Sequence, residues 1–401
     1  MAYSAIETGP VSSINALTAN QMPDNDRVLY LLEPYQYPLF QKLYFSEGHK
    51  AKPVVNDRGL FSWFEDELYP RFTTVTNMTG TAATDATNTI GAQIFQVNDI
   101  VIFEQSMQMA YVTVASGTQT TFSSMDGATA LIAVTGGVVR KIGVLDHEFA
   151  GLRTSVSTQE IQVSNYLTKF SETVSFTGRQ DSSEQWTDGK NFASELKKKI
   201  REMKLHFENN FKFSNDSGTK TVVGSDGNSY RATYGKGFLG FIITNKVSYT
   251  TLTEDVLDDF FGRCANTGGS NKKTGYAGWN ISMAAGKLIK QKYAINPTPY
   301  TTEYGVELTK YHITGSVIDM PWDPTMDQTF ADYMFLVDFN APKKAITMRY
   351  MADDHKGSRK FRVESDVEVK GTDGRIDKIM ADIGIEVPNQ ETDGILYKVP
   401  A

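Results

Sequence analysis

The feature that most constrains this sequence is a stripe of apolar side chains between residues 190 and 213. At ~1.5 Å per residue, a helix over this range would be roughly 36 Å long, enough to cross a small domain. Thr187 and Asp188 are candidates for its N-cap. Six large apolar residues recur at steps of three or four, the spacing of one helix face: Phe192, Leu196, Ile200, Met203, Phe207 and Phe211. We therefore expect a long helix against which the rest of a domain packs.

The other face of this predicted helix carries a run of lysines and an arginine. A basic run on a helix is usually a face exposed to solvent, and the alternative is a face that contacts nucleic acid. The whole chain has a net charge of -7, from 40 basic and 47 acidic residues, so it has no overall cationic field. Any DNA contact would therefore be local. The candidate DNA-facing residues are Lys197, Lys198, Lys199 and Arg201.

The N-terminal part of the chain has the composition of an arm. Residues 1 to about 27 are small and polar, with no periodic apolar face. An apolar block follows, in which Pro34 and Pro38 prevent one continuous helix and force a turn. We expect an arm that ends in a short apolar anchor.

Two extended segments then enclose a region of short apolar runs. Trp63 and Phe64 belong to a predicted strand that ends in an acidic turn, and residues 148–178 return as an extended, Thr/Ser-rich segment. Between them, residues 92–144 contain alternating runs separated by glycine turns, which is typical of a small antiparallel barrel or sandwich. The sequence predicts an extended hairpin with an inserted β module. Such a hairpin is too thin to bury a core and needs a neighbouring chain.

After the long helix, strands and helices alternate without the strict order of a doubly wound sheet, which indicates an α+β fold. Residues 238–244 are expected to form a strand, and residues 266–278 a loop. A capping box at Thr251 to Glu254 opens a helix whose apolar face includes Cys264. This cysteine is the only one, so no disulfide can form within the chain.

No catalytic or cofactor-binding motif in the sequence has the spacing and flanking secondary structure that its chemistry requires. Gly235 to Gly240 fits GxGxxG, but a strand is predicted after it where a dinucleotide site needs a helix, so we interpret it as a turn with close backbone approach. The five histidines are scattered and none has a metal-ligand spacing. We expect no enzyme activity, no cofactor and no metal. No stretch has the length of a membrane span, and the chain reads as unexported.

The order of these elements resembles that of the major capsid proteins of tailed bacteriophages with the Hong Kong 97-type fold. Individual segments are also similar to those of the family. They are the Pro-xxx-Pro segment 32–40, the Trp and acidic segment 63–70, the returning strand 165–178, the helix 192–211, the glycine segment 237–245 and the late strand 356–364. Each is short, but together they follow the family's order over residues 28 to 385.

The resemblance implies a domain plan. The N-arm would be 1–55, the E-loop 56–91 with 145–180, and the inserted β module 92–144. The peripheral domain would be 181–250 with 340–401, including the spine helix 190–213, and the axial domain 251–339. Pro34, Pro38, Trp63, Phe64 and the stripe on the helix would then be core or assembly residues.

The resemblance also implies a function. The chain would assemble with copies of itself into hexamers and pentamers of an icosahedral shell enclosing phage double-stranded DNA, in the cytoplasm of a bacterial host. Further partners would be a portal and separate scaffolding or cement proteins, and no membrane would be contacted. Two alternatives are an encapsulin-like nanocompartment shell and, more distantly, an enzyme with a β-barrel accessory module, which would need titratable residues converging in one pocket.

Overall fold

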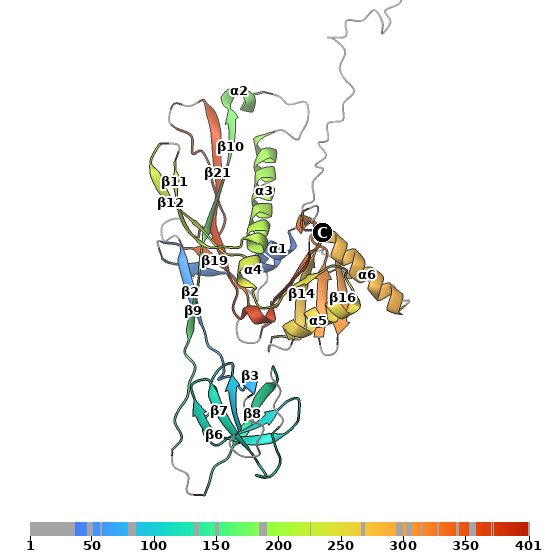
Figure 1. Cartoon of the computed structure of the whole chain (residues 1–401). Coiled ribbons are helices and arrows are strands. Elements are labelled where there is room, and N and C mark those ends of the chain that lie inside the picture. Colours follow the sequence, from blue (N-terminus) through green and yellow to red (C-terminus); the bar gives the residue numbers. More distant parts are fainter. Residues whose placement is uncertain are drawn as a thin grey trace, which may run out of the picture. The chain divides into compact units, whose positions relative to one another are not determined.

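The computed structural model forms two compact units, which are described separately (Figure 1). Unit 1 comprises residues 1–63 and 164–401, and unit 2 comprises residues 64–163. The residues that the structure describes are 37–45, 51–56, 58–78, 86–131, 136–148, 152–183, 191–224, 226–265, 269–293, 300–301, 307–313, 316–326, 329–341, 345–352, 358–369, 371 and 373–399. Pro34, Thr187, Asp188 and most of the predicted N-arm lie outside them.

The first layer of unit 1 is a five-stranded sheet with the order β1-β19-β21-β10, in which β20 also pairs with β21. Its longest strand is β21, which pairs antiparallel with β10 along the whole of β10. The strands are β1 (Lys52–Val54), β10 (Thr168–Thr177), β19 (Thr347–Met351), β20 (Arg362–Glu364) and β21 (Gly374–Glu386). Two short helices border this layer, α1 (Pro38–Phe45) and α2 (Gly178–Asp181).

The long helix α3 (Phe192–Phe213) packs on this sheet, and four of the six residues of the predicted stripe are buried, whereas Leu196 and Ile200 are partly exposed. Met203, Phe207 and Phe211 are at most 1% exposed. The ring of Phe207 meets Phe170 of β10 at 4.8 Å between centroids. The predicted capping residues are wrong, because α3 begins later: the side chain of Asn191 accepts the hydrogen bond from the backbone N–H of Ser194 at 2.8 Å.

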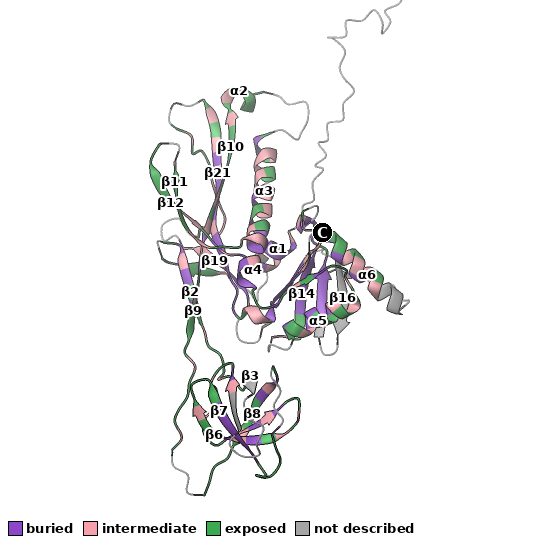
Figure 2. Ribbon diagram, in the orientation of Figure 1, coloured by how far each residue is buried: buried purple, intermediate pink, exposed green. Residues whose placement is uncertain are grey.

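The second layer of unit 1 is a seven-stranded sheet with the order β13-β22-β18-β14-β17-β16-β15. Its strands are β13 (Lys246–Tyr249), β14 (Lys272–Ala277), β15 (Tyr300–Thr301), β16 (Glu307–Ile313), β17 (Ser316–Pro321), β18 (Tyr333–Val337) and β22 (Gly394–Lys398). Helices α5 (Glu254–Ala265) and α6 (Trp279–Tyr293) contribute Phe260, Cys264 and Ile281 to its core. Figure 2 shows the buried residues gathered in these strands.

Two local predictions are wrong. The expected loop 266–278 contains β14, a central strand; its two lysines and Gly275 suggested a loop, but Lys273 is buried with an ion-pair partner. The expected strand 238–244 begins with a short helix, α4 (Phe238–Phe241). The glycines before and within α4 do allow the predicted close approach, since a Cβ on Gly237 would lie 2.5 Å from the carbonyl oxygens of Asn210 and Phe211.

Three smaller pieces complete unit 1. The strands β11 (Gly218–Val223) and β12 (Ser229–Tyr234) form a separate antiparallel hairpin, and almost all of its residues are exposed or partly exposed. Two 3-10 helices, η2 (Pro324–Met326) and η3 (Gln390–Thr392), follow β17 and β21 respectively. The strands β2 (Leu60–Glu65) and β9 (Ile161–Tyr166) pair with each other where the chain passes between the units. The paired part of the expected hairpin is therefore short.

Unit 2 is built around a closed six-stranded barrel with the order β3-β4-β7-β6-β5-β8. Its interior holds Val75, Val101, Val112, Phe122 and Val139, each 0% exposed. The strands are β3 (Phe72–Met78), β4 (Ala86–Ile90), β5 (Asp99–Phe103), β6 (Met109–Ser116), β7 (Gln119–Ser124) and β8 (Val138–Val144). The sequence boundary at residue 92 is therefore too late, because β3 and β4, assigned above to the hairpin, are barrel strands.

Candidate assembly surfaces and a buried ionic junction

An ionic junction joins α1 to the C-terminal end of α3. Pro38 is the first residue of α1 and has no N–H to satisfy. The next two backbone N–H groups, of Leu39 and Phe40, donate to the carboxylate of Glu208 at 3.0 and 2.6 Å. The N–H of Gln41 then makes the first intrahelical bond, to the carbonyl of Tyr37 at 3.1 Å. One carboxylate of α3 therefore satisfies the start of α1.

The same junction reaches the loop after β17. The ammonium of Lys212, one turn after Glu208, contacts Glu208 Oε1 at 2.6 Å and Asp323 Oδ2, and donates to Thr325 Oγ1 at 2.8 Å. The side chains of Glu208, Lys212 and Asp323 are all 0% exposed. Loss of hydration raises the pKa of Glu208, although Lys212 opposes this shift. The junction thus holds α1, α3 and η2 together by buried charges.

A second buried charge cluster lies at the edge between β14, β18 and β22. Lys273 contacts Asp338 at 3.3 Å and donates to the carbonyl of Thr392 at 2.7 Å. Asp393 accepts the backbone N–H of Asp338 on Oδ1 at 2.8 Å, while its Oδ2 has no hydrogen-bond partner among the described residues. Burial raises the pKa of Asp393 to about 8. This carboxyl is therefore mostly protonated at neutral pH.

The basic face of α3 is partly committed to intrachain contacts. Lys197 and Lys198 are exposed. Lys199 pairs with Glu202 at 2.6 Å, and this hydrogen bond raises the pKa of Lys199. Arg201 is partly exposed. The two exposed lysines are thus the members of this face best placed to meet a partner.

The apolar candidates before α3 divide into buried and exposed residues. Pro38 is buried at the start of α1. Trp63 is 3% exposed and lies between the rings of Phe61 and Phe241, at centroid distances of 6.1 and 5.7 Å. Phe64, the next residue of β2, is 64% exposed. Trp63 is therefore a core residue of unit 1, whereas Phe64 is available to a partner.

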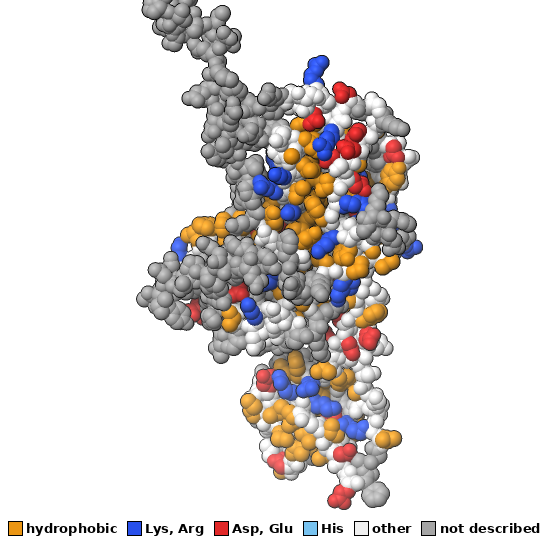
Figure 3. Space-filling view, turned by 180° about the vertical axis from the view of Figure 1, so that it is seen from behind, with side chains coloured by type: hydrophobic (Ala, Val, Ile, Leu, Met, Phe, Trp, Pro, Cys, Tyr) orange, Lys and Arg blue, Asp and Glu red, His pale blue; other side chains and the backbone are white. Residues whose placement is uncertain are grey.

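The barrel of unit 2 has an apolar outer face. The strand register aligns Phe72, Arg140, Ile102 and Met109 in one row across β3, β8, β5 and β6. Phe72 is 57% exposed, Met109 45%, and Ile142, two residues beyond Arg140 on β8, 49%. Figure 3 shows hydrophobic side chains gathered on this unit with Lys and Arg among them. An outward barrel face of this kind is typical of a contact surface.

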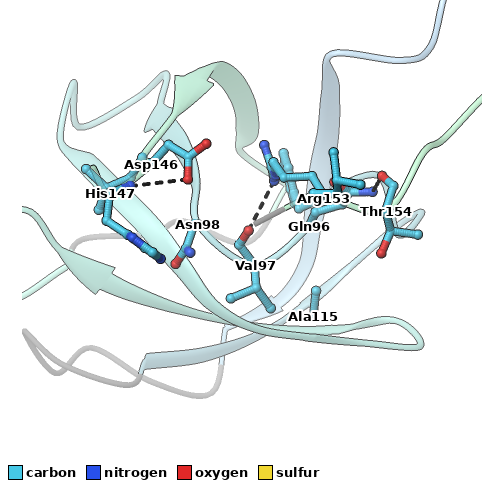
Figure 4. Close-up of a pocket in the computed structure, with 11 residues that line it drawn as sticks. Gln96, Val97, Asn98, Ala115, Asp146, His147, Arg153 and Thr154 are labelled. Atoms are coloured by element: carbon cyan, nitrogen blue, oxygen red, sulfur yellow. Dashed lines mark hydrogen bonds between the residues drawn. The ribbon is translucent and has the colours of Figure 1, made fainter. Parts of the chain in front are cut away.

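Unit 2 also has a shallow hollow of about 510 Å³ beside the barrel (Figure 4). Arg153 reaches across it, donating to the carbonyl of Val97 at 3.1 Å and to Asp99 at 2.7 Å. Lys141 also pairs with Asp99, at 2.7 Å. The guanidinium and the buried carboxylate therefore fix the segment after the barrel against its rim, and His147 lies on the opposite side (Figure 4).

Within the described ranges, no group of three or more His, Cys, Asp or Glu side chains is arranged to hold a metal ion. None of the helices in the part of the chain that the structure describes is long and apolar enough to cross a membrane.

A family model described as SU10 major capsid protein matches residues 11–400. The chain belongs to the SU10 major capsid protein family. It is a structural shell protein of a virion capsid, and its fold is α+β. No curated protein matches the chain.

Several solved capsid and encapsulin structures are similar to this capsid protein at low sequence identity. The capsid of a native GTA particle is 11% identical, with 96% of this chain and 97% of that chain covered and a TM-score of 0.48. Mycobacterium phage Bobi is 8% identical, with 98% and 100% covered and a TM-score of 0.47. An encapsulin complex from Synechococcus elongatus is 11% identical, with 60% and 77% covered and a TM-score of 0.41.

Sequence reasoning missed both buried charge clusters. Glu208 and Lys212 follow Phe207 and Phe211 by one residue each, so they lie at the border of the apolar stripe. A Glu–Lys pair at i and i+4 usually indicates an exposed helix face. Here the pair is buried because α1 and η2 pack against this end of α3, and that packing cannot be predicted from the local sequence. Asp323 and Asp393 lie in loops that show no local pattern.

Proposed function

We propose that this capsid protein assembles with copies of itself into hexamers and pentamers of an icosahedral shell around the double-stranded DNA of a tailed phage. The observation that carries the proposal is the surface of unit 2. Of the large apolar side chains exposed in the described residues, more than half lie in residues 64–163, a quarter of the chain. A monomer with this surface would be prone to aggregate, so neighbouring copies are expected to cover it.

Within that shell, unit 1 forms the wall, and unit 2 contacts a neighbouring subunit. We assign residues 56–71 with 145–180 to the E-loop, with the barrel strands within residues 72–144 as its insertion, and residues 1–55 to the N-arm. Residues 181–250 with 340–401 form the peripheral domain around the spine helix α3, and residues 251–339 the axial domain. The separate sheets of unit 1 support a peripheral and an axial part. Strands β13 and β22 pair within the second sheet, so these two strands are an exception to the ranges and belong to the axial part.

The exposed lysines of α3 supply weak, sequence-independent contact with DNA. Of the four candidates, Lys197 and Lys198 are exposed, and Lys199 and Arg201 are partly exposed. A chain of net charge -7 with a small local cationic face can enclose DNA without holding it tightly. The role is structural and needs no catalysis or cofactor. A portal, and separate scaffolding or cement proteins, are the further partners, and assembly takes place in the bacterial cytoplasm.

An encapsulin-like nanocompartment is the second candidate function, and particles purified from expressing bacteria distinguish the two. The phage shell predicts icosahedral particles that hold nuclease-protected double-stranded DNA when the other virion components are present. Particles that enclose a protein cargo and no DNA in the same setting would favour the nanocompartment. Recovery of only soluble monomer would contradict both.

A further inference from the structure

The junction at the end of α3 has an unequal charge count. One ammonium, on Lys212, faces two carboxylates, Glu208 and Asp323, and all three side chains are 0% exposed. Each buried ion costs several kcal/mol of hydration, and one lysine cannot neutralise two carboxylates. Condensation of the ammonium with Asp323 would remove two of the three buried charges, and the remaining carboxylate of Glu208 would keep the backbone N–H donors of Leu39 and Phe40.

We propose that Lys212 and Asp323 condense to an amide, an isopeptide bond within the chain, and that Glu208 is the catalytic proton carrier. The three reacting groups are already in contact. Lys212 Nζ touches both Asp323 Oδ2 and Glu208 Oε1, the latter at 2.6 Å. Since the residues lie on α3 and just before η2, no neighbouring copy is needed.

The proton and electron balance of the step is complete. Glu208 takes one proton from the Lys212 ammonium and passes it to Asp323 Oδ2, which leaves a neutral amine and a neutral carboxylic acid. The lone pair of Nζ then forms the N–C bond to Cγ, and the π pair moves onto Oδ1. Glu208 removes a second proton from nitrogen and delivers it to Oδ2, which departs as water when the carbonyl re-forms. Glu208 ends as the carboxylate with which it began.

The surroundings of Asp323 favour attack at its Cγ. Its Oδ1 accepts the backbone N–H of Thr325 at 3.0 Å and the Thr325 hydroxyl at 2.7 Å. These donors are aimed at the oxygen on which negative charge develops, as in an oxyanion hole. Oδ2 is left on the side of Lys212 and is the oxygen that leaves.

The site also excludes the water that would reverse the reaction. The fully buried ring of Tyr276 covers the amine, with Nζ 5.7 Å from its centroid. Fixed contact between nucleophile and electrophile replaces an encounter in solution, which in other systems is worth effective concentrations of about 10⁵ M or more.

The bond would link the spine helix to the axial part of the chain. Lys212 and Asp323 are 111 residues apart in sequence. A covalent link across this separation restricts the unfolded chain much as a disulfide does. It would also keep η2 attached to α3 if the surrounding sheet opened.

The intact mass of the purified full-length protein, measured after denaturation, tests the proposal. The expected mass is that of the sequence less one water, and fragmentation should give a branched peptide that joins the segments containing Lys212 and Asp323. A mass equal to that of the sequence, both before and after assembly, would overturn the proposal.

Variants test whether the loss of one water from the protein mass occurs at Lys212 and Asp323. Lys212→Arg and Glu208→Gln should have the full mass, and Asp323→Asn should lose one ammonia in place of one water. Lys199→Arg, at a partly exposed lysine of the same helix, is the matched control and should still lose water. Water loss that persists in Lys212→Arg would place the dehydration elsewhere and refute the bond, and water loss in Glu208→Gln at the wild-type extent would refute the role of Glu208.

Discussion

Asp393 offers a direct test of the energetic cost of a buried carboxyl group in this shell protein. It is 1% exposed, Oδ1 accepts one backbone hydrogen bond, and Oδ2 has no partner among the described residues. Burial raises its pKa from 3.8 to about 8. Asn has nearly the same shape as the protonated acid and cannot ionise. We therefore expect Asp393→Asn to stabilise the folded protein at neutral and alkaline pH.

The magnitude follows from linkage. The folded protein keeps a proton that the unfolded chain releases above pH 3.8, so stability falls as pH rises from 3.8 to about 8 and is then level. Each unit of pKa shift is worth about 1.4 kcal/mol, so at pH 7 the wild-type carboxyl costs roughly 4 kcal/mol relative to an exposed one. Asp393→Asn should regain up to this amount, less any cost of placing its amide N–H₂.

Urea unfolding of the unassembled protein from pH 6 to pH 9 measures this effect. The wild type should lose stability across pH 6 to 8, and Asp393→Asn should lose less over the same range. Asp366→Asn, at a side chain that is 71% exposed, is the control and should behave like the wild type. Equal pH dependence of wild type and Asp393→Asn, or lower stability of the variant at pH 8, would refute the reasoning.

Three further predictions concern folding and assembly. Phe207→Asp should abolish soluble folding because an unpaired charge would be buried at a 0% exposed site, whereas Asn209→Asp on the exposed face of α3 should fold; equal yields in a solubility assay would contradict this. Phe72→Ser with Ile142→Ser should leave the barrel folded, by circular dichroism, but reduce particle yield several-fold in light scattering; an unchanged yield would remove the apolar face from assembly. Lys197→Glu should weaken retention of DNA by assembled particles most clearly at low salt, and retention equal to the wild type at all salt concentrations would exclude contact at this face.

The parts of the fold that could be predicted from the sequence are those with a local period. The stripe from Phe192 to Phe211 has the helix period and lies on one helix, α3, where four of its six residues are buried. The short runs of residues 92–144 have the strand period and turn glycines, and those within residues 99–124 and 138–144 form barrel strands. Their partners β3 and β4 are rich in Thr and Asn, so their membership depends on closing the barrel rather than on apolar alternation.

The parts that sequence reasoning missed depend on contacts between distant segments. Strand β14 is central although it begins with two lysines, because Asp338 neutralises Lys273 inside the sheet. The junction of Glu208, Lys212 and Asp323 likewise joins residues that no spacing rule connects. The family order of segments predicted the shell function, but it contains no information on these charges.

The most direct test of the shell assignment is electron microscopy, with light scattering, of the purified protein under assembly conditions. The account predicts capsomers, tubes or closed shells, because the apolar face of unit 2 needs a neighbouring copy. A stable, compact monomer of 44.6 kDa under all such conditions would contradict it.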